Sequence, residues 1–403
     1  MSKLEELIKQ YCPSGVDYKT LGELGKFYGG LTGKSKGDFT DGNAAFITYK
    51  NVYSNPALDL HPSEKVRINE GEKQRTLKYG DVLFTGSSET SDECGFSSVV
   101  TEEPSEDLYL NSFCFIYRLN YLDKLIPEFC KHLFRSSNLR YQIGKTASGV
   151  TRFNVSKDKM AKVVIPVPPL EVQREIVRIL DNFTELTAEL TAELTARKKQ
   201  YEYYFNKIMN MYNSPVVKLG DIGQVKMCKR IMKAQTSSEG EIPFYKIGTF
   251  GKEPDAYMSR ELYDDYVTKY SYPSKGDILI SCSGTIGRTV VFDGAPAYFQ
   301  DSNIVWLEHD GTKVSNEYLR FAYMTNPWII STGGTISRLY NDGILKAEIP
   351  LPSLEEQKNI VAFLSRFDTI CNDLSTGLPA EIEARQKQYE YYRDKLLTFK
   401  PLS

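Results

Sequence analysis

The sequence predicts an α+β protein in which two β-rich α/β domains are separated by an antiparallel pair of long coiled-coil helices, with a pseudo-twofold internal repeat. Three observations support this fold class. A long helical segment occurs twice, a β-rich block precedes each copy, and the two β-rich blocks faintly echo one another. Such a chain is most simply built from two half-molecules, so we expect two similar but non-identical surfaces and a bipartite ligand.

The repeated helical segment is the strongest signal. Its first copy reads IPVPPLEVQREIVRILDNF from Ile165, and its second reads IPLPSLEEQKNIVAFLSRF from Ile349. Each copy ends in a second shared block, Arg-x-Lys-Gln-Tyr-Glu-Tyr-Tyr, at 197–204 and at 385–392. Apolar residues recur through the first copy in steps of four and three, the heptad pattern of a coiled-coil seam. Two such helices in one chain most simply pack against each other.

Local signals predict where the helices begin and what sets their length. The Pro168-Pro169 pair fixes the first start, and Ser353-Leu-Glu-Glu356 is a capping box for the second. A continuous helix over 171–212 would extend about 60 Å at ~1.5 Å per residue. Within it, Thr187-Ala-Glu-Leu190 is repeated as Thr191-Ala-Glu-Leu194. Each unit lengthens the helix by about 6 Å and rotates the downstream part of the helix by ~40°.

The chain divides into four blocks. We expect a first β-rich domain at 1–164, a central helical spacer at 165–212, a second β-rich domain at 213–348 and a C-terminal helical spacer at 349–403. Short strand-like runs mark the first domain, at Ala44–Thr48, Asp81–Thr85 and Phe113–Tyr117. In both domains a Gly-Asp pair, at 80–81 and at 276–277, predicts a turn into a short buried strand. In the second spacer, Ser375-Thr-Gly-Leu-Pro379 stands where a smooth helix is expected.

Composition predicts a globular protein of a reducing cytoplasm. Of the 403 residues, 41% are hydrophobic and 25% charged, and no run approaches the length of a membrane span. The charged N-terminus MSKLEELIKQ is unlike a secretory signal. The seven cysteines are scattered without a C-x-x-C pair and the three histidines lie far apart, so we expect neither disulfides nor a metal site.

The net charge of −2 does not predict a nucleic-acid binder, but the distribution of basic residues along the chain is more informative. Basic residues dominate between Phe129 and Val163, and a second run without acids holds Lys226, Lys229, Arg230 and Lys233. Basic patches on a near-neutral chain suit a protein that contacts phosphates with selected faces. Ordinary solvated faces are the alternative reading of the same charges.

Two catalytic or nucleotide motifs fail on inspection. Gly29-Gly-Leu-Thr-Gly-Lys-Ser35 has too few residues between its glycines for a phosphate-binding loop. The nearest matches to an amino-methyltransferase motif, Val167-Pro-Pro-Leu170 and Asn326-Pro-Trp328, also fail. No Ser/His/Asp or paired-carboxylate constellation stands out, so the chain is expected to be non-catalytic and to hold no cofactor.

The paired helical blocks resemble the two conserved regions of the specificity (S) subunit of type I DNA restriction–modification enzymes. The resemblance rests on Pro-x-Pro-x-Leu-Glu-x-Gln-x-x-Ile-Val at 166–177 and 350–361 and on the two tail blocks. The Thr-Ala-Glu-Leu repeat resembles the spacer repeat of one branch of that family. The likeness covers the whole chain in order: target recognition domain, conserved helix, second recognition domain, second conserved helix.

The resemblance implies a non-catalytic, sequence-specific DNA-binding subunit. Each recognition domain would bind one half of a split double-stranded DNA target, with the spacer set by the helices. Implied partners are two methylation (M) subunits, which bring S-adenosylmethionine and methylate adenine, and restriction (R) subunits, which use ATP and Mg to cut DNA.

Candidate DNA-binding residues lie in the β-rich blocks. In the first domain they are Lys34, Ser35, Lys36, Ser87 and Arg152, and in the second Lys226, Lys229, Arg230, Ser283 and Arg338. Arg152 and Arg338 are paired because Thr-Arg-Phe precedes one conserved region and Ser-Arg-Leu precedes the other. The alternative is that each is an ordinary surface base.

Tyrosines crowd the tail blocks and are candidates for binding the M subunits. We select Tyr203, Tyr204, Tyr391 and Tyr392, because tyrosine is enriched at protein interfaces. The alternative is that half of them fill the coiled-coil seam, to which the heptad assigns Tyr201 and Tyr204. In that case Tyr203 and Tyr391 are the better interface candidates.

Two other functions are compatible with the sequence. One keeps the architecture but makes the chain a coiled-coil scaffold whose two domains bind proteins. The other is an enzyme of unknown type hidden in the β-rich blocks. The duplicated β frameworks with basic turns favour a DNA-binding function over the protein-binding scaffold.

Overall fold

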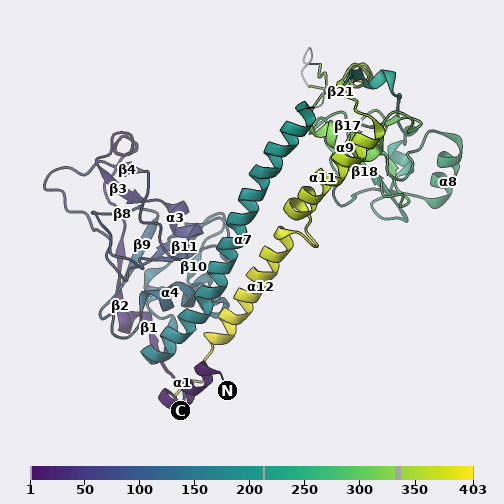
Figure 1. Cartoon of the computed structure of the whole chain (residues 1–403). Helices are drawn as coiled ribbons and strands as arrows, with labels where there is room; N and C mark the ends of the chain where they lie inside the picture. The colour runs from purple at the N-terminus through teal and green to yellow at the C-terminus, as the bar shows by residue number, and fades with distance from the viewer. Residues whose placement is uncertain (1, 212–213, 332–336, 403) are drawn as a thin grey trace. The chain divides into compact units, whose positions relative to one another are not determined.

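The computed structural model describes residues 2–211, 214–331 and 337–402, and it divides into two compact units (Figure 1). The first unit comprises Met1–Ala192 with Ala380–Ser403, and the second comprises Glu193–Pro379. The expected domain boundary between residues 212 and 213 lies outside the described residues.

The first unit is built around a four-stranded antiparallel sheet in the order β2-β9-β5-β7. A smaller sheet, β4-β3-β8, pairs β3 with β8 in parallel. Its elements before the long helix are α1 (Lys3–Tyr11), β1 (Asp17–Thr20), α2 (Leu21–Leu24), β2 (Gly25–Gly29), η1 (Lys36–Phe39), β3 (Ala44–Ile47), α3 (Tyr49–Ser54), β4 (Lys65–Val66), β5 (Val82–Thr85), β6 (Ser87–Ser88), β7 (Ser97–Val99), β8 (Tyr109–Leu110), β9 (Cys114–Leu119), α4 (Pro127–Leu133), α5 (Ser137–Gly144), β10 (Ala147–Ser148), β11 (Phe153–Val155), α6 (Lys157–Met160) and β12 (Val164–Val167).

The second unit repeats this plan. Its main sheet has the order β14-β20-β17-β18, and its smaller sheet β16-β15-β19 again contains one parallel pair. Its elements are β13 (Val216–Lys218), η2 (Leu219–Asp221), β14 (Gln224–Lys226), η3 (Lys233–Gln235), β15 (Ile242–Tyr245), β16 (Tyr257–Met258), α8 (Arg260–Lys269), β17 (Ile278–Ser281), β18 (Thr289–Val291), β19 (Tyr298–Phe299), β20 (Ile304–Glu308), α9 (Asn316–Met324), α10 (Asn341–Leu345) and β21 (Glu348–Pro350).

Both main sheets are buried on two faces, which explains why their strands are nearly all apolar. In the first unit Val82 and Phe84 join a core with α4 and α5, while Leu83 packs on the opposite side. In the second unit Ile278 and Ile280 face one core and Leu279 faces the other. Alternate side chains of a strand point to opposite faces, so each strand contributes to two cores.

The predicted Gly-Asp turns are confirmed. Gly80 and Gly276 have φ of 83° and 94°, the left-handed region that glycine enters without strain. The aspartates fix the turns, since Asp81 accepts a hydrogen bond from the Lys78 N–H at 2.9 Å and Asp277 accepts one from the Ser274 N–H at 2.8 Å. Strands β5 and β17 come directly after these turns.

The long first helix, α7, is continuous from Leu170 to Met211, immediately after the proline pair (Figure 1). The second copy is two helices, α11 (Leu354–Asn372) and α12 (Leu378–Leu396). The Ser353 capping box is present as predicted. The interruption follows from local chemistry, because the Asp373 carboxylate accepts hydrogen bonds from the backbone N–H groups of Ser375 and Thr376 and from both hydroxyls, and so stabilises a turn.

Each copy of the repeat begins with a short strand, inside the blocks expected to be helical spacers and before the expected helix starts. Ile165 and Pro166 lie in β12, which pairs antiparallel with β1. Ile349 and Pro350 lie in β21, which pairs antiparallel with β13. The partner strand is far away in sequence, so the local Ile-Pro pattern did not reveal the pairing.

The helices pack in each unit through the predicted seam. In the second unit the Tyr201 and Tyr204 rings lie 6.3 and 5.9 Å from the Phe367 ring of α11, and Tyr204 also lies 5.7 Å from Phe363. In the first unit Phe183 of α7 stacks on Tyr392 of α12 at 5.3 Å. The heptad assignment of Tyr201 and Tyr204 to the seam is confirmed.

Candidate nucleic-acid interface

Two predicted residues of the first domain meet at the end of β5. Arg152 stands just before β11, and β11 pairs with β6, which contains Ser87. The Arg152 Nε and Nη2 groups both donate to Ser87 Oγ, at 3.1 and 2.9 Å. The guanidinium also lies 5.5 Å from the ring of Phe113, a side chain that is 57% exposed. An arginine and an exposed aromatic ring together form a surface that suits a nucleic acid.

This pair lies at the rim of a pocket of about 590 Å³. Its lining includes aromatic, hydroxyl and acidic side chains: Tyr49, Tyr53, Ser87, Ser88, Glu89, Glu93, Phe113, Thr151 and Arg152. Tyr49 Oη donates to the Ser87 carbonyl at 2.8 Å. Tyr53 Oη donates to Glu93 Oε1 at 3.2 Å, and Ser88 Oγ donates to Glu93 Oε2 at 3.1 Å.

Two arginines of the basic run are structural. Arg135 donates to the carbonyls of Ser97, at 2.8 Å from Nε, and Tyr53, at 2.9 Å. Arg140 donates to the carbonyls of Cys94 and Gly95, and both guanidinium groups lie over the Phe96 ring. Burial lowers the pKa of each to about 10, so both stay protonated at neutral pH. Neither arginine lines the pocket, but Arg135 holds the backbone of Tyr53, which does.

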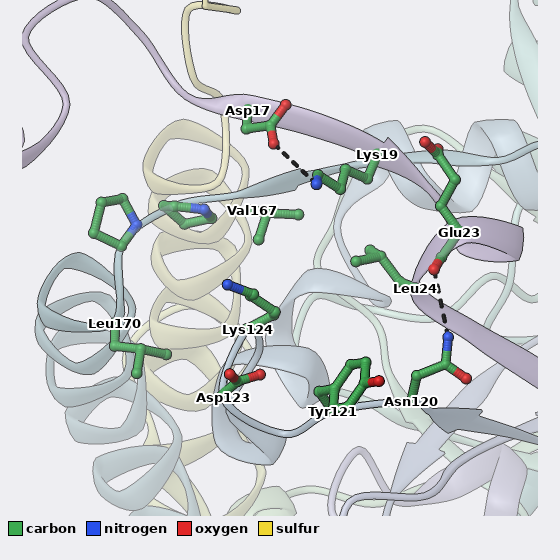
Figure 2. A pocket seen from close by; sticks show the side chains of 12 residues that line it. Asp17, Lys19, Glu23, Leu24, Asn120, Tyr121, Asp123, Lys124, Val167 and Leu170 are labelled. Atoms are coloured by element: carbon green, nitrogen blue, oxygen red, sulfur yellow. Dashed lines mark hydrogen bonds and ion pairs between the residues drawn. The ribbon is translucent and has the colours of Figure 1, made fainter.

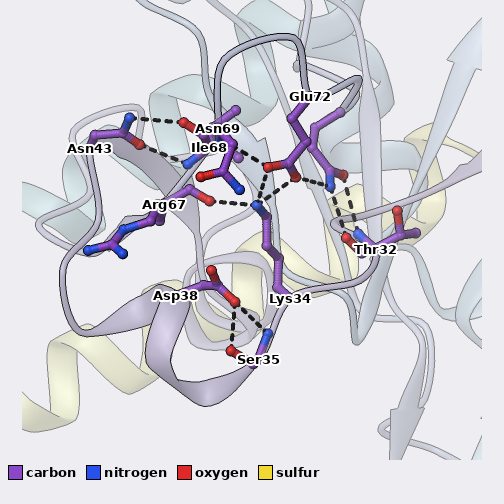
Figure 3. Close-up of polar contacts among 10 residues, drawn as sticks. Thr32, Lys34, Ser35, Asp38, Asn43, Arg67, Ile68, Asn69 and Glu72 are labelled. Carbon is purple, nitrogen blue, oxygen red and sulfur yellow. Dashed lines mark hydrogen bonds and ion pairs between the residues drawn. The ribbon is translucent and has the colours of Figure 1, made fainter.

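The environment of Lys34 differs from the expectation of a free basic residue. Its side chain is only 6% exposed, and its Nζ bonds the Arg67 carbonyl and the Glu72 carboxylate, each at 2.6 Å (Figure 3). Hydrogen bonds from the Asn69 N–H and from Lys34 lower the pKa of Glu72 to about 2. Contact with a phosphate would require breaking this ion pair. Partners so far away in sequence left no local signal.

The neighbouring candidates, Ser35 and Lys36, differ from each other. Ser35 closes a capping box with Asp38, its N–H and Oγ each 2.7 Å from Asp38 Oδ2 (Figure 3). Lys36 is exposed at the start of η1. Of this trio, Lys36 is therefore the one available to an external anion.

In the second domain the predicted residues gather around the turn at residues 301–303. Arg338 Nη2 donates to the Ser302 carbonyl at 2.8 Å, Ser283 Oγ donates to Asn303 Oδ1 at 2.9 Å, and Arg230 pairs with Asp301 at 2.9 Å. Ser302 has a positive φ of 54°. A pocket of about 600 Å³ beside this turn is lined by Arg230, Lys233 and Lys246, together with Asp255 and the turn itself.

The two remaining candidates of the second domain lie apart from that turn. Lys226 is half-buried in β14 and lies 3.4 Å from Glu308. Lys229 is exposed, with its Nζ 5.2 Å from the Tyr270 ring. Lys229 is thus more accessible to a phosphate than Lys226.

A further pocket, of about 450 Å³, lies in the first unit where α7 begins (Figure 2). It is lined by Asp17, Lys19, Glu23, Asp123 and Lys124, among others, and contains none of the predicted DNA-binding residues. The Asp17 and Lys19 side chains pair at 3.4 Å. Charges of both signs make this pocket a poor phosphate site.

The four tyrosine candidates fall into two pairs. Tyr203 and Tyr391 are 60% and 61% exposed, each 5.3 Å from the ring of the tyrosine that comes next in the chain. Tyr204 and Tyr392 have their rings against seam phenylalanines. The equal exposure of Tyr203 and Tyr391 matches their equivalent places in the two tail blocks.

Two glutamines that were not among the predicted site residues join each domain to its helix by hydrogen bonds. The buried Gln173 side chain accepts from the Ile126 N–H at 3.0 Å and donates to the carbonyls of Lys124 and Pro168. Gln357 makes the same set with Ser315, Lys313 and Pro352. The signal was present, because this glutamine is part of the repeated Pro-x-Pro-x-Leu-Glu-x-Gln motif.

A second contact between the first domain and its helices is made by a histidine. His132 of α4 is buried, with Nδ1 2.9 Å from Tyr389 Oη of α12 and Nε2 2.7 Å from Asp181 Oδ1 of α7. Burial lowers the pKa of His132, so the neutral ring is favoured. The equivalent position in α9, counted from the backbone N–H that bonds each glutamine, is the buried Phe321.

Among the described residues no group of three or more His, Cys, Asp or Glu could hold a metal ion. Within the same part of the chain no helix is long and apolar enough to cross a membrane.

The chain is similar to known proteins over most of its length. A family model described as "Type I restriction modification DNA specificity domain" matches residues 13–197 and 211–384. A Haemophilus influenzae protein named as a type I restriction enzyme specificity subunit is 53% identical over 294 residues, 70% of this chain and 75% of that protein. The EcoR124I/EcoR124II specificity subunit of Escherichia coli is 34% identical over 268 residues, 61% of this chain and 65% of that protein.

Solved structures share the fold. A chain from a study of complex assembly and conformational transition of the type I R-M system matches with a TM-score of 0.63 and 20% identity, over 96% of this chain and 98% of that one. The S subunit from M. genitalium matches with a TM-score of 0.54 and 14% identity, over 95% and 96%. With both matched domains, the duplicated sheets and the paired helices in place, the chain belongs to the specificity subunits of type I restriction–modification systems, the non-catalytic subunits that recognise the DNA target.

Proposed function

We propose that this subunit binds a bipartite double-stranded DNA target, with one half-site for each recognition domain. The domains are assigned to 1–164 and 213–348, and the spacers to 165–212 and 349–403. One observation carries the proposal: the same strand order occurs twice, with different polar side chains after equivalent strands. A shared framework with different loops is what two different half-sites require.

Phosphate and base contacts are assigned by accessibility. Lys36, Lys229 and Arg230 are exposed and suit phosphate contacts, which position a protein without reading sequence. Arg152 with Ser87, and Arg338 with Ser283, lie beside the two pockets or the turn that borders one of them, and suit base contacts. Lys34, Ser35 and Lys226 support the loops that carry these residues.

The subunit directs chemistry that its partners perform. We infer that two M subunits bring S-adenosylmethionine and methylate adenine, and that R subunits use ATP and Mg to cut DNA. Tyr203 and Tyr391, with Tyr204 and Tyr392 behind them, are the proposed docking surface for the M subunits. We also infer a reducing cytoplasm as its compartment, in which the seven free, buried cysteines would stay reduced.

Methylome sequencing tests the bipartite target. Cells with the gene are expected to carry methylated adenines in one split motif that is absent from cells without it. A gel shift with random duplex, alone and with the M subunits, separates DNA binding from a protein scaffold. A motif with a single uninterrupted site would contradict the proposal.

Inserting one more Thr-Ala-Glu-Leu unit after Leu194 tests the role of α7. One unit adds about 6 Å of helix, or one to two base pairs at ~3.4 Å per step. The methylome of the insertion strain is therefore expected to keep both half-sites and lengthen the gap between them. Altered half-site bases with an unaltered gap would contradict the spacer role.

A further inference from the structure

The pocket at the end of β5 contains a carboxylate where a phosphate-binding surface would carry only cations. Glu93 is half-buried, between the Tyr53 and Ser88 hydroxyls that donate to its two oxygens. Among the described residues no lysine or arginine forms an ion pair with it. Its charge is therefore free to select a ligand by the donors that the ligand presents.

The Glu93 carboxylate is held in place by packed neighbours. The Tyr53 ring lies 4.8 Å from Phe96 and stacks on Tyr49 at 6.2 Å. The Tyr53 backbone carbonyl accepts from Arg135, and Tyr49 Oη donates to Ser87. A side chain fixed this way loses little further conformational freedom on binding, which is the geometry a specific site needs.

The carboxylate retains unused acceptor capacity. Two oxygens offer about four lone-pair positions, and the Tyr53 and Ser88 hydroxyls use one position on each oxygen. A phosphate would be repelled by Glu93, and no metal-binding group exists among the described residues. The remaining positions are therefore available to a hydrogen-bond donor of the ligand.

DNA presents such donors at base edges in the major groove. Cytosine offers its N4 amino group and adenine its N6 amino group, whereas guanine and thymine offer acceptors there. Arg152, in the same pocket, has the complementary chemistry, because a guanidinium pairs with guanine O6 and N7. An acid and an arginine that line one pocket thus match the two members of a C·G pair.

We propose that Glu93 is a base-reading residue of the first recognition domain, accepting a hydrogen bond from an exocyclic amino group, cytosine N4 or adenine N6, in the first half-site. The inference rests on the bipartite target proposed above. It also predicts that the second half-site does not depend on this residue. Counting back from the paired strands β7 and β18, the position of Glu93 corresponds to Thr285 in the second unit.

The test uses the complete complex with its M subunits and a set of duplexes. Each duplex replaces one base pair of the first or second half-site, as defined by the methylome of the unaltered strain. Glu93→Gln keeps the size of the side chain but adds a donor. Discrimination is expected to fall about 5- to 100-fold at one base pair of the first half-site. That pair carries cytosine or adenine, and the duplex set shows which.

Three controls make the result decisive. Glu103→Gln, an exposed acid of the β7–β8 loop outside the pocket, should leave every ratio unchanged. Salt-dependent binding of random duplex should persist in Glu93→Gln and in Glu93→Ala, because phosphate contacts supply it. Thermal unfolding shows that each variant is folded.

Unchanged discrimination in both Glu93 variants would overturn the assignment while leaving the bipartite function intact. Loss of random-duplex binding by a folded variant would also overturn it, since the residue would then act on affinity alone. If the unaltered strain shows no split motif, the proposed function itself fails before any variant is made.

Discussion

The two recognition domains have the same strand order but differ in the loop that comes after the equivalent strand. In the first domain, the Thr85 N–H donates to the Phe96 carbonyl, and the loop between these residues is 86–95. In the second domain, the Ser281 N–H donates to the Arg288 carbonyl, and the loop between them is 282–287. The longer loop carries Glu89, Asp92 and Glu93, whereas the shorter one has no acid. The sheet therefore fixes the position of the proposed DNA-contacting surface, and the loop fixes its chemistry.

The contact between each domain and its helix, unlike the loops, is nearly the same in the two units. Gln173 and Gln357 make the same hydrogen bonds in the two units, so this contact was kept while the loops diverged. His132 and Phe321 fill equivalent buried positions with different chemistry. Shared contacts thus hold the architecture, and unshared contacts give each half its own properties.

The largest expected effect concerns the shared contact. Gln173→Ala and Gln357→Ala each leave a part-buried backbone N–H and two carbonyls without their glutamine partner, so each is expected to cost about 2 to 4 kcal/mol in the free energy of unfolding of its own unit. Denaturant unfolding followed by hydrogen exchange assigns the loss to a unit. Gln386→Ala, on the exposed face of α12, is the matched control and should change little. Unequal losses of stability in the two variants would contradict the equivalence of the two glutamine contacts.

The paired arginines sharpen the comparison at the reading surfaces. Arg152→Ala is expected to weaken recognition of the first half-site by about 1 to 3 kcal/mol, and Arg338→Ala to do so at the second. Competition binding with half-site mutants measures each effect. Lys65→Ala, which removes an exposed lysine outside both pockets, serves as the control. Unchanged DNA affinity in the double alanine variant would exclude both arginines as contacts.

The exposed tyrosines test whether the two tail blocks are equivalent docking sites. Tyr203→Ala and Tyr391→Ala are each expected to weaken binding of one M subunit by about 1 to 2 kcal/mol. Titration followed by native mass spectrometry distinguishes complexes with one M subunit from those with two. Tyr121→Ala, which removes a still more exposed tyrosine outside the helices, should have no effect. Native affinity in the double variant would rule out this surface.

The smallest effect is a difference in acid sensitivity. The pKa of His132 is lowered by burial, so the unfolded state binds more protons than the folded state below its ordinary pKa of about 6.5. The stability contributed by the neutral ring is therefore present above that pH and decreases as the pH falls below it. Asp181, Lys131, Arg393 and Tyr389 surround the ring.

His132→Phe, which copies the second unit, removes this titration. Unfolding of the first unit is measured at pH 7.5 and at pH 5.5 for both proteins. The variant is expected to lose less stability over this interval, even if its absolute stability is lower because Asp181 and Tyr389 lose a partner. An identical pH dependence in the two proteins would contradict the role of His132.

The sequence by itself determined the architecture of this protein. The internal repeat predicted two halves, Pro168-Pro169 and the Ser353 capping box located the helix starts, and the Gly-Asp pairs located two turns. The segment Ser375–Pro379 marked the place where the second helix breaks. These signals are local, because caps, turns and heptads depend on residues within a few positions of one another.

Only the tertiary structure decided which charges are available. Lys34 is neutralised by Glu72, the guanidinium groups of Arg135 and Arg140 donate to backbone carbonyls, and Glu93 has no lysine or arginine ion-pair partner among the described residues. The partners in these contacts come from distant parts of the chain, so neighbouring sequence does not indicate them. A lysine or arginine with a structural role and one that contacts DNA look the same in sequence. Only the long-range packing around the side chain distinguishes them.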